Sequence, residues 1–136
     1  MPILRGLRAT FLLTKKEGIT DEEFKNHYLN IHAPMSLELM KRHGVISYTH
    51  QYLSASSKAE LSSALGGHTP QIPYDAVTTI GFPSLEAFKA FLADPENLGR
   101  LREDSKNYAQ AGPGTVQIGW GEEWVVIHEG DVVGEA

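Results

Sequence analysis

The segment TDEEFKNHYLNIHAPM, residues 20–35, decides the fold more than any other part of the chain. Thr20 is followed three residues later by Glu23, the capping-box spacing in which each side chain satisfies a free backbone N–H of the first helical turn. A helix is therefore predicted to begin at Thr20. Its apolar face follows spacings of four, three and four residues and consists of Phe24, Tyr28, Ile31 and Met35.

Pro34 interrupts this helical pattern, because it cannot donate a backbone hydrogen bond and its ring clashes with the preceding turn. The first helix should end or kink around His32-Ala33, and a second helix should begin at Pro34 and stop at Gly44. His27 and His32 lie on opposite edges of the apolar face. Since they are five residues apart rather than four, their spacing is poor for a shared metal ion, and no metal site is predicted.

Patterns of period two outside this segment predict four strands, at residues 7–13, 45–54, 76–82 and 116–128. A second pair of helices, capped by Ser84 and Asp94, follows the third strand. Residues 54–73 form a long connection rich in Ser, Ala, Gly and Pro, whose middle can form a short helix. The resulting β-α-β-β-α-β order predicts an α+β, ferredoxin-like fold, in which helices cover one face of a four-stranded antiparallel sheet.

The other face of this sheet also needs a cover, because the third and fourth predicted strands carry apolar residues on both sides. A second copy of the chain can cover it through a two-fold, self-complementary contact, so a homodimer is expected. The 136 residues are expected to form a single domain, 1–136, with a core at about 7–128 and a solvated C-terminal tail.

Composition argues against several classes of function. The chain has 12 Lys+Arg, 17 Asp+Glu and no cysteine, which rules out disulfide scaffolds, cysteine nucleophiles and cysteine-ligated metals. The net charge of −5, with no basic stripe, predicts no nucleic-acid partner. Apolar runs are a few residues long where a membrane span needs about 20, and no secretory signal is visible, so a cytoplasmic protein without a membrane partner is expected.

Several residues can carry chemistry. His32 lies beside Tyr28 at the helix interruption and can act as a general acid or base, although the pattern by itself favours a histidine bonded to a helix-end carbonyl. Asp104 lies at the edge of a predicted buried helix face, where it can orient a histidine or pair with Lys106 or Arg100. Alternating aromatic side chains on the second strand either line a pocket for a flat phenolic ligand or pack in the interior: Tyr48, His50 and Tyr52.

The segment Phe24-Lys25-Asn26-His27-Tyr28-Leu29-Asn30-Ile31-His32-Ala33-Pro34-Met35 resembles the first helix of the EthD family, with its Phe, aromatic pair and His-Ala-Pro block. Tyr74-Asp75-Ala76-Val77, Ser84-Leu85-Glu86-Ala87, Asp104 with Tyr108, and Glu122-Glu123-Trp124-Val125-Val126 extend the resemblance over residues 7–128. It implies a dimeric α/β barrel of two ferredoxin-like subunits. It also implies a cofactor-independent enzyme of aromatic polyketide pathways, which dehydrates, decarboxylates, cyclises or oxidises its substrate.

The resemblance makes His32 the expected catalytic residue, with Tyr28 and Asp104 as its neighbours. The resulting hypothesis is a lyase or cyclase in which His32 moves a proton, Tyr28 and His50 donate hydrogen bonds to a developing enolate, and Asp104 orients. The side chains expected to bind the small aromatic substrate are Phe24, His27, Tyr48, Tyr52, Phe88 and Trp124. Two alternatives stay open: a haem-binding or cofactor-free anthrone or quinol oxygenase of the same barrel fold, and a non-catalytic binding or accessory dimer.

Overall fold

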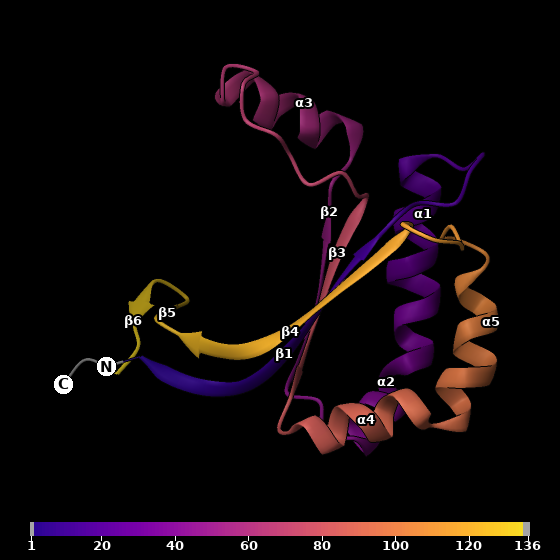
Figure 1. Cartoon of the computed structure of the whole chain (residues 1–136), viewed down its shortest axis with the longest axis vertical. Coiled ribbons are helices and arrows are strands. Elements are labelled where there is room, and N and C mark those ends of the chain that lie inside the picture. The colour runs from indigo at the N-terminus through magenta and orange to yellow at the C-terminus, as the bar shows by residue number, and fades with distance from the viewer. Residues whose placement is uncertain (1, 135–136) are drawn as a thin grey trace.

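Four antiparallel strands form the central sheet in a computed structural model that describes residues 2–134 (Figure 1). The strands lie in the order β2-β3-β1-β4, so β1 and β3 are central. Their bounds are β1 Ile3–Leu13, β2 Ser47–Tyr52, β3 Ala76–Phe82 and β4 Val116–Val125. A separate hairpin follows, formed by β5 Ile127–His128 and β6 Asp131–Val132.

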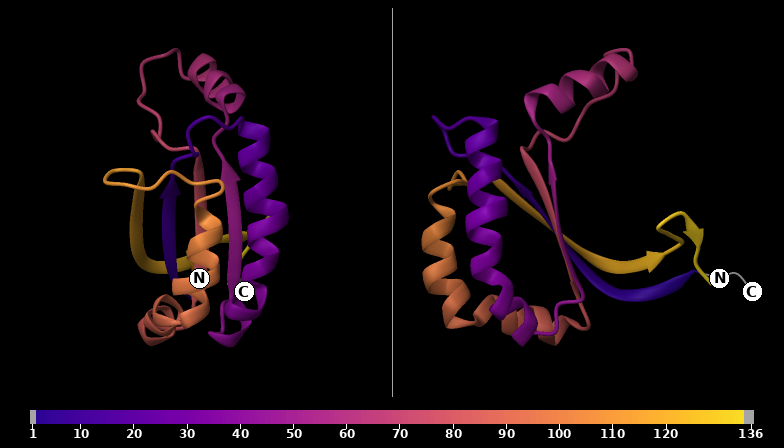
Figure 2. Two further views of the ribbon diagram at one scale, coloured as in Figure 1. Left: turned by 90° about the vertical axis from the view of Figure 1, so that its right-hand side faces the viewer. Right: turned by 180° about the vertical axis from the view of Figure 1, so that it is seen from behind.

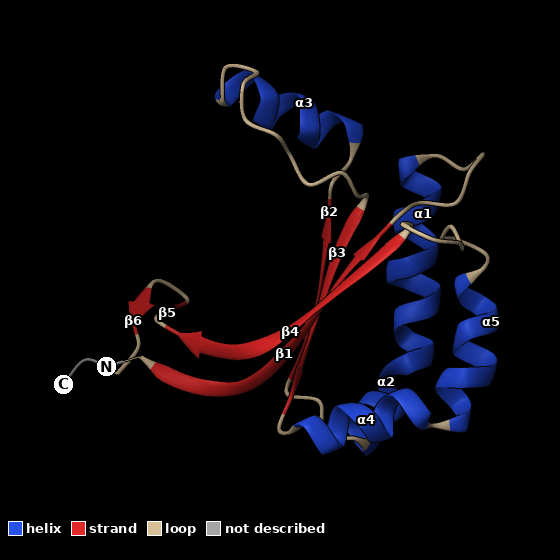
Figure 3. Cartoon of the chain, viewed as in Figure 1, coloured by secondary structure: helices blue, strands red, loops and turns tan. Residues whose placement is uncertain are grey.

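The helices lie against one face of this sheet, apart from α3, which projects away from it (Figures 2 and 3). Their bounds are α1 Asp21–His27, α2 Ala33–Arg42, α3 Ala55–Ala64, α4 Leu85–Ala93 and α5 Arg102–Ser105. Two π-helical turns complete the runs, η1 at Tyr28–His32 and η2 at Asn97–Leu101. None of the helices within residues 2–134 has the length and apolar character needed to cross a membrane.

The first helix does not end before Pro34, because α1, η1 and α2 form one continuous helical run, but the regular helix is interrupted there by the π-helical turn η1, and α2 begins at Ala33. The backbone N–H of Ala33 bonds to the carbonyl of Tyr28, five residues back, and this wider turn accommodates the proline one residue later. The wider turn also changes which residue, one turn after Tyr28, faces the sheet. His32 takes that place, whereas Ile31, expected on the apolar face, is 43% exposed.

Strand register decides which side chains face the helices. His50 on β2 is opposite Thr78 on β3, and Thr78 is opposite Phe11 on β1, so these three lie in one row on the helix side. The opposite face is more polar than expected, with a row of threonines formed by Thr49, Thr79 and Thr10. The expectation of two apolar faces is therefore wrong, because small and polar side chains alternate with the apolar ones.

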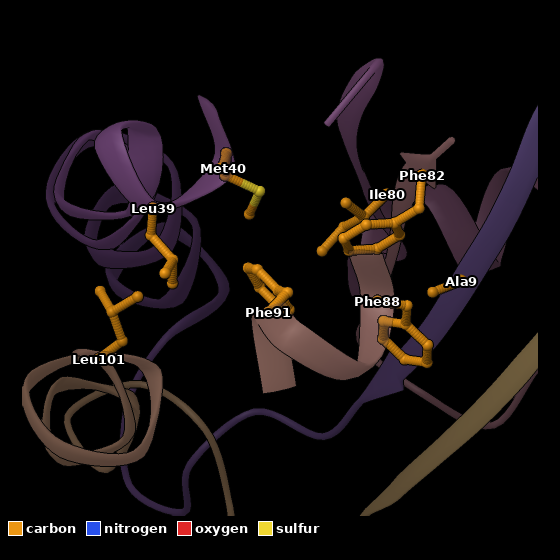
Figure 4. Packing of buried hydrophobic residues seen from close by; sticks show 8 residues of the cluster. All are labelled: Ala9, Leu39, Met40, Ile80, Phe82, Phe88, Phe91 and Leu101. Atoms are coloured by element: carbon orange, nitrogen blue, oxygen red, sulfur yellow. The ribbon is translucent and has the colours of Figure 1, made fainter. Parts of the chain in front are cut away.

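The main core lies between α2, α4 and the middle of the sheet. Figure 4 shows Phe91 of α4 between the helix residues Leu39 and Met40 and the strand residues Ile80 and Phe82. A second buried cluster lies nearer the start of α1 and consists of Phe24, Tyr28, Ala76 and Tyr108. The two clusters hold the helical run on the sheet at both ends, and η1 begins in the second cluster with Tyr28.

The predicted capping box is present at the start of α1. The Thr20 hydroxyl accepts from the Glu23 N–H at 3.0 Å, and Glu23 Oε1 accepts from the Thr20 N–H at 3.2 Å. Thr20→Ala should therefore lower the free energy of unfolding, measured by chemical denaturation, by about 1 kcal/mol. Thr20→Ser keeps the hydroxyl and should lose much less; an equal loss in both variants would contradict a role for the cap.

Candidate active site

A cavity of about 150 Å³ lies between the helical layer and the sheet, between the two π-helical turns. Each turn contributes two side chains to its wall, Tyr28 and His32 from η1 and Asn97 and Leu101 from η2. The remaining lining residues are Phe11, Leu13, Ser36, Met40, Tyr48, Thr78, Ile80, Phe91 and Tyr108. The wall thus combines apolar side chains with several hydroxyls, the Asn97 amide and one imidazole, as in many small-molecule sites.

His32 is oriented by a carboxylate from another helical segment. Its Nδ1 lies 2.9 Å from Oδ2 of Asp104 on α5. Nε2 of His27 contacts the same carboxylate at 3.1 and 3.2 Å, and Asn107 donates to it at 3.2 Å. Of the two alternatives for Asp104, the structure forms the contact with a histidine and not the pair with Lys106 or Arg100. Lys106 binds Glu103 instead, and Arg100 binds Glu96 and the Met35 carbonyl.

Burial and hydrogen bonding set the charges of this pair. Burial works against ionisation of Asp104, but the hydrogen bonds from His32, His27 and Asn107 outweigh it and lower the pKa of the carboxyl group. Burial lowers the pKa of His32, opposed by Asp104 and assisted by His27 and Arg100. At neutral pH an ionised Asp104 therefore accepts the Nδ1–H of a neutral His32. Nε2 of His32, which has no hydrogen-bond partner within residues 2–134, carries the lone pair.

Tyr28 lines the cavity beside His32. Its hydroxyl hydrogen-bonds to Thr78 at 2.5 Å, and its ring stacks between His50 and Tyr108, with centroid distances of 3.9 and 4.6 Å. Burial raises the pKa of Tyr28 well above its usual value, so the phenol keeps its proton. The stacked rings hold this hydroxyl in place.

The three alternating residues of β2 form one hydrogen-bonded chain. Nε2 of His50 lies 2.8 Å from the Tyr48 hydroxyl, and Nδ1 lies 2.7 Å from the Tyr52 hydroxyl. Burial lowers the pKa of His50 to about 4 and raises that of Tyr48 to about 12, so all three are uncharged at neutral pH. A neutral imidazole has one donor and one acceptor, so one phenol donates to His50 and the other keeps its proton for another partner.

The structure brings together only some of the side chains expected to bind substrate. Tyr48 lines the cavity, and His50 lies directly behind it. His27 and Tyr52 lie outside the lining. Their polar atoms contact Asp104 and His50, respectively.

Three aromatic residues expected around a ligand also lie elsewhere. Phe24 is 2% exposed and packs in the second core cluster. Phe88 stacks on Trp120 at 4.6 Å, in the first cluster. Trp124 is 52% exposed, because β4 curves beyond the helices where it pairs with the N-terminal part of β1 (Figure 1).

Sequence reasoning missed two hydroxyl residues of the cavity. Thr78 is the polar member of the alternating series Ala76, Thr78, Ile80 and Phe82, and a threonine in an otherwise apolar row is a signal that could have found it. Ser36 is 2% exposed and its hydroxyl donates to the Ala33 carbonyl. Within residues 2–134, no group of three or more His, Cys, Asp or Glu side chains is arranged to hold a metal ion.

Comparisons with known proteins show what the whole chain is similar to. The family model described as EthD domain matches residues 16–112. The decarboxylase claH of Passalora fulva is 31% identical over 130 residues, covering 95% of this chain and 83% of that protein. The dehydratase ustZ of Ustilaginoidea virens is 31% identical over 109 residues, covering 78% of this chain and 76% of that protein.

A solved structure matches the fold. It is a dimeric protein of unknown function and ferredoxin-like fold from Bacteroides fragilis, with a TM-score of 0.56 at 11% identity. The match covers 89% of this chain and 100% of the other. The ferredoxin-like fold predicted from the order of strands and helices is confirmed.

Proposed function

Because this chain belongs to the EthD domain family, we propose that it is a lyase, a decarboxylase or dehydratase that needs no cofactor and acts on an aromatic polyketide-type substrate. The observation that carries this proposal is the His32–Asp104 pair. Asp104 holds Nδ1 of His32, and the free Nε2 belongs to a residue in the wall of the cavity. A neutral imidazole oriented in this way is suited to proton transfer.

In a dehydration, Nε2 of His32 removes a proton from the carbon next to a carbonyl group, and the electron pair moves toward the carbonyl oxygen. The hydroxyl group on the next carbon then leaves as water, taking the proton from the His32 imidazolium, which returns His32 to its neutral state. Tyr28 and Tyr48 supply protonated hydroxyls from the cavity wall, because burial raises the pKa of both. Such hydroxyls can stabilise the negative charge that develops on the carbonyl oxygen.

A decarboxylation uses the same groups in another order. The bond to the carboxylate breaks, carbon dioxide leaves, and the electron pair passes into the ring or onto a carbonyl oxygen. The vacated carbon then needs a proton, which His32 delivers after taking it from a substrate hydroxyl. Both reactions thus need one group that first removes a proton as a base and then returns it as an acid. A site with a single such group fits relatives named decarboxylase and dehydratase.

The size of the cavity limits the part of the substrate that it encloses. A volume of about 150 Å³ is enough for one benzene-sized ring. We infer that the reacting ring enters the cavity beside His32, and that further rings of a larger substrate remain outside. The same size argues against the haem-binding alternative, since a macrocycle needs far more room. The active form is proposed to be a homodimer, as in the solved structure from Bacteroides fragilis.

The pH dependence of kcat/KM tests the proposed state of His32. Activity requires the unprotonated imidazole, so the rate should fall as the pH drops below the pKa of His32, which burial lowers from the usual value of about 6.5. On the alkaline side the rate should stay level to about pH 10, because the pKa of Tyr48 is raised to about 12. A steep fall between pH 7 and 9 would contradict this assignment.

Native mass spectrometry of freshly purified protein, followed by turnover of hydroxylated aromatic acids and ketones, tests the function itself. A dimer that carries an aromatic metabolite and releases carbon dioxide or water from a tested compound would support the lyase. A dimer that carries haem would favour the oxygenase alternative. If no compound in the panel raises the melting temperature or reacts, the non-catalytic accessory protein is favoured, since a ligand of the native state raises stability.

A further inference from the structure

One carboxylate serves two imidazoles in this structure. Asp104 contacts Nε2 of His27 through both oxygens and Nδ1 of His32 through Oδ2. The two histidines differ in their surroundings. The His27 side chain is 22% exposed and lies outside the cavity lining, whereas the His32 side chain is 13% exposed and lies in it.

We propose that His27 is a positioning residue that shares the Asp104 carboxylate with His32 and takes up the first proton of this three-residue cluster, so that its charge then opposes protonation of His32. This inference rests on the proposed catalytic role of His32. It assigns to His27 a role different from substrate binding, since its ring faces Asp104 and stacks on Tyr108 with a centroid distance of 5.4 Å.

The charge balance of the cluster supports this order of protonation. One ionised carboxylate can neutralise one imidazolium, and a second proton would leave a net positive charge in a half-buried site. The groups that face His32 are Asp104, His27, Arg100, Tyr28 and Tyr108. Both phenols are uncharged, because burial raises their pKa values, and the Arg100 guanidinium adds to the repulsion of a charge on His32.

His27 is the better place for the first charge. The groups that face it are Asp104, with hydrogen bonds to both oxygens, the uncharged ring of Tyr108, and His32. Its greater exposure lets water stabilise the imidazolium. Once His27 is charged, its field opposes protonation of His32, while the Asp104 carboxylate still accepts the Nδ1–H of His32 and keeps its orientation.

NMR titration of protein with ¹⁵N-labelled histidine tests the proposal without any substrate. In the unmodified protein, the His27 ring should titrate at a higher pH than the His32 ring. In His27→Gln, which keeps a hydrogen-bond donor but cannot be charged, the His32 midpoint should rise by about one pH unit, as expected when a nearby charge is removed. His27→Phe should raise it similarly, and His43→Gln, which alters a separate histidine bound to Asp94, should leave it unchanged.

A His32 ring that titrates above His27, or a His32 midpoint unmoved in His27→Gln, would overturn the proposal. A rise in His27→Phe but not in His27→Gln would also overturn it, since the hydrogen bond rather than the charge would then matter. A second measurement is the acid limb of kcat/KM, which should move up with the His32 midpoint in His27→Gln while the alkaline plateau is unchanged. If the titrations behave as expected but His32→Gln remains active, the function proposed for His32 fails while the charge order stands.

Discussion

Replacing His32 by glutamine should lower kcat by about 10²–10⁴-fold, the usual contribution of a histidine general acid or base. Glutamine keeps an amide N–H that can reach Asp104 in place of Nδ1, but it has no group that takes up a proton near neutral pH. The loss should therefore appear in kcat more than in KM, because ring binding relies on the apolar wall of the cavity. Steady-state kinetics on any compound that the protein turns over measures this.

His43→Gln provides a matched control for this substitution. His43 also pairs with an aspartate, since its Nε2 lies 2.8 Å from Oδ2 of Asp94, but it packs on Phe91 at the end of α2 rather than lining the cavity. Losing this pair should lower stability and leave kcat near its original value. A His32→Gln protein that folds normally and retains more than about a tenth of the original kcat would remove His32 from the chemistry.

The first helical run illustrates what local sequence can predict. The capping box at Thr20 depends on contacts within a few residues, and the inward-facing positions of Phe24 and Tyr28 follow from their spacing of four; the structure contains the box and buries both rings. The π-helical turn η1 could not be predicted, because it depends on a competition between hydrogen bonds to the fourth and fifth preceding carbonyls next to Pro34. That turn decides that His32 rather than Ile31 faces the sheet.

The site depends on contacts across long sequence distances, which periodicity alone does not predict. His32 and Asp104 are separated by 72 residues, and only the resemblance to a known family suggested that they meet. The position of Trp124 was missed for a similar reason. Alternation along β4 tells which face a side chain takes, but not that the strand curves beyond the helices there (Figure 1).

Asp104→Asn should lower kcat by about 10²–10⁴-fold, although the asparagine side chain nearly matches that of aspartate in shape. An ionised carboxylate only accepts hydrogen bonds, so it requires His32 to carry its proton on Nδ1 and leaves Nε2 free. An amide can instead donate to Nδ1, which puts the proton of a neutral imidazole on Nε2 and abolishes the base. Steady-state kinetics together with the ¹⁵N shifts of the His32 ring, which report its tautomer, measure both effects.

Asp94→Asn is the control for this variant, because Asp94 also binds a histidine but caps a helix, accepting from the Glu96 N–H at 2.9 Å. It should lose stability and keep turnover, whereas Asp104→Asn should lose turnover.

Removal of the Asp104 carboxylate and removal of the His27 charge should move the pKa of His32 in opposite directions. Without the carboxylate that raises its pKa, His32 should titrate at a lower pH, whereas without the His27 charge it should titrate at a higher one. If the His32 midpoint moved in the same direction in Asp104→Asn and in His27→Gln, the electrostatic basis of the site would be contradicted.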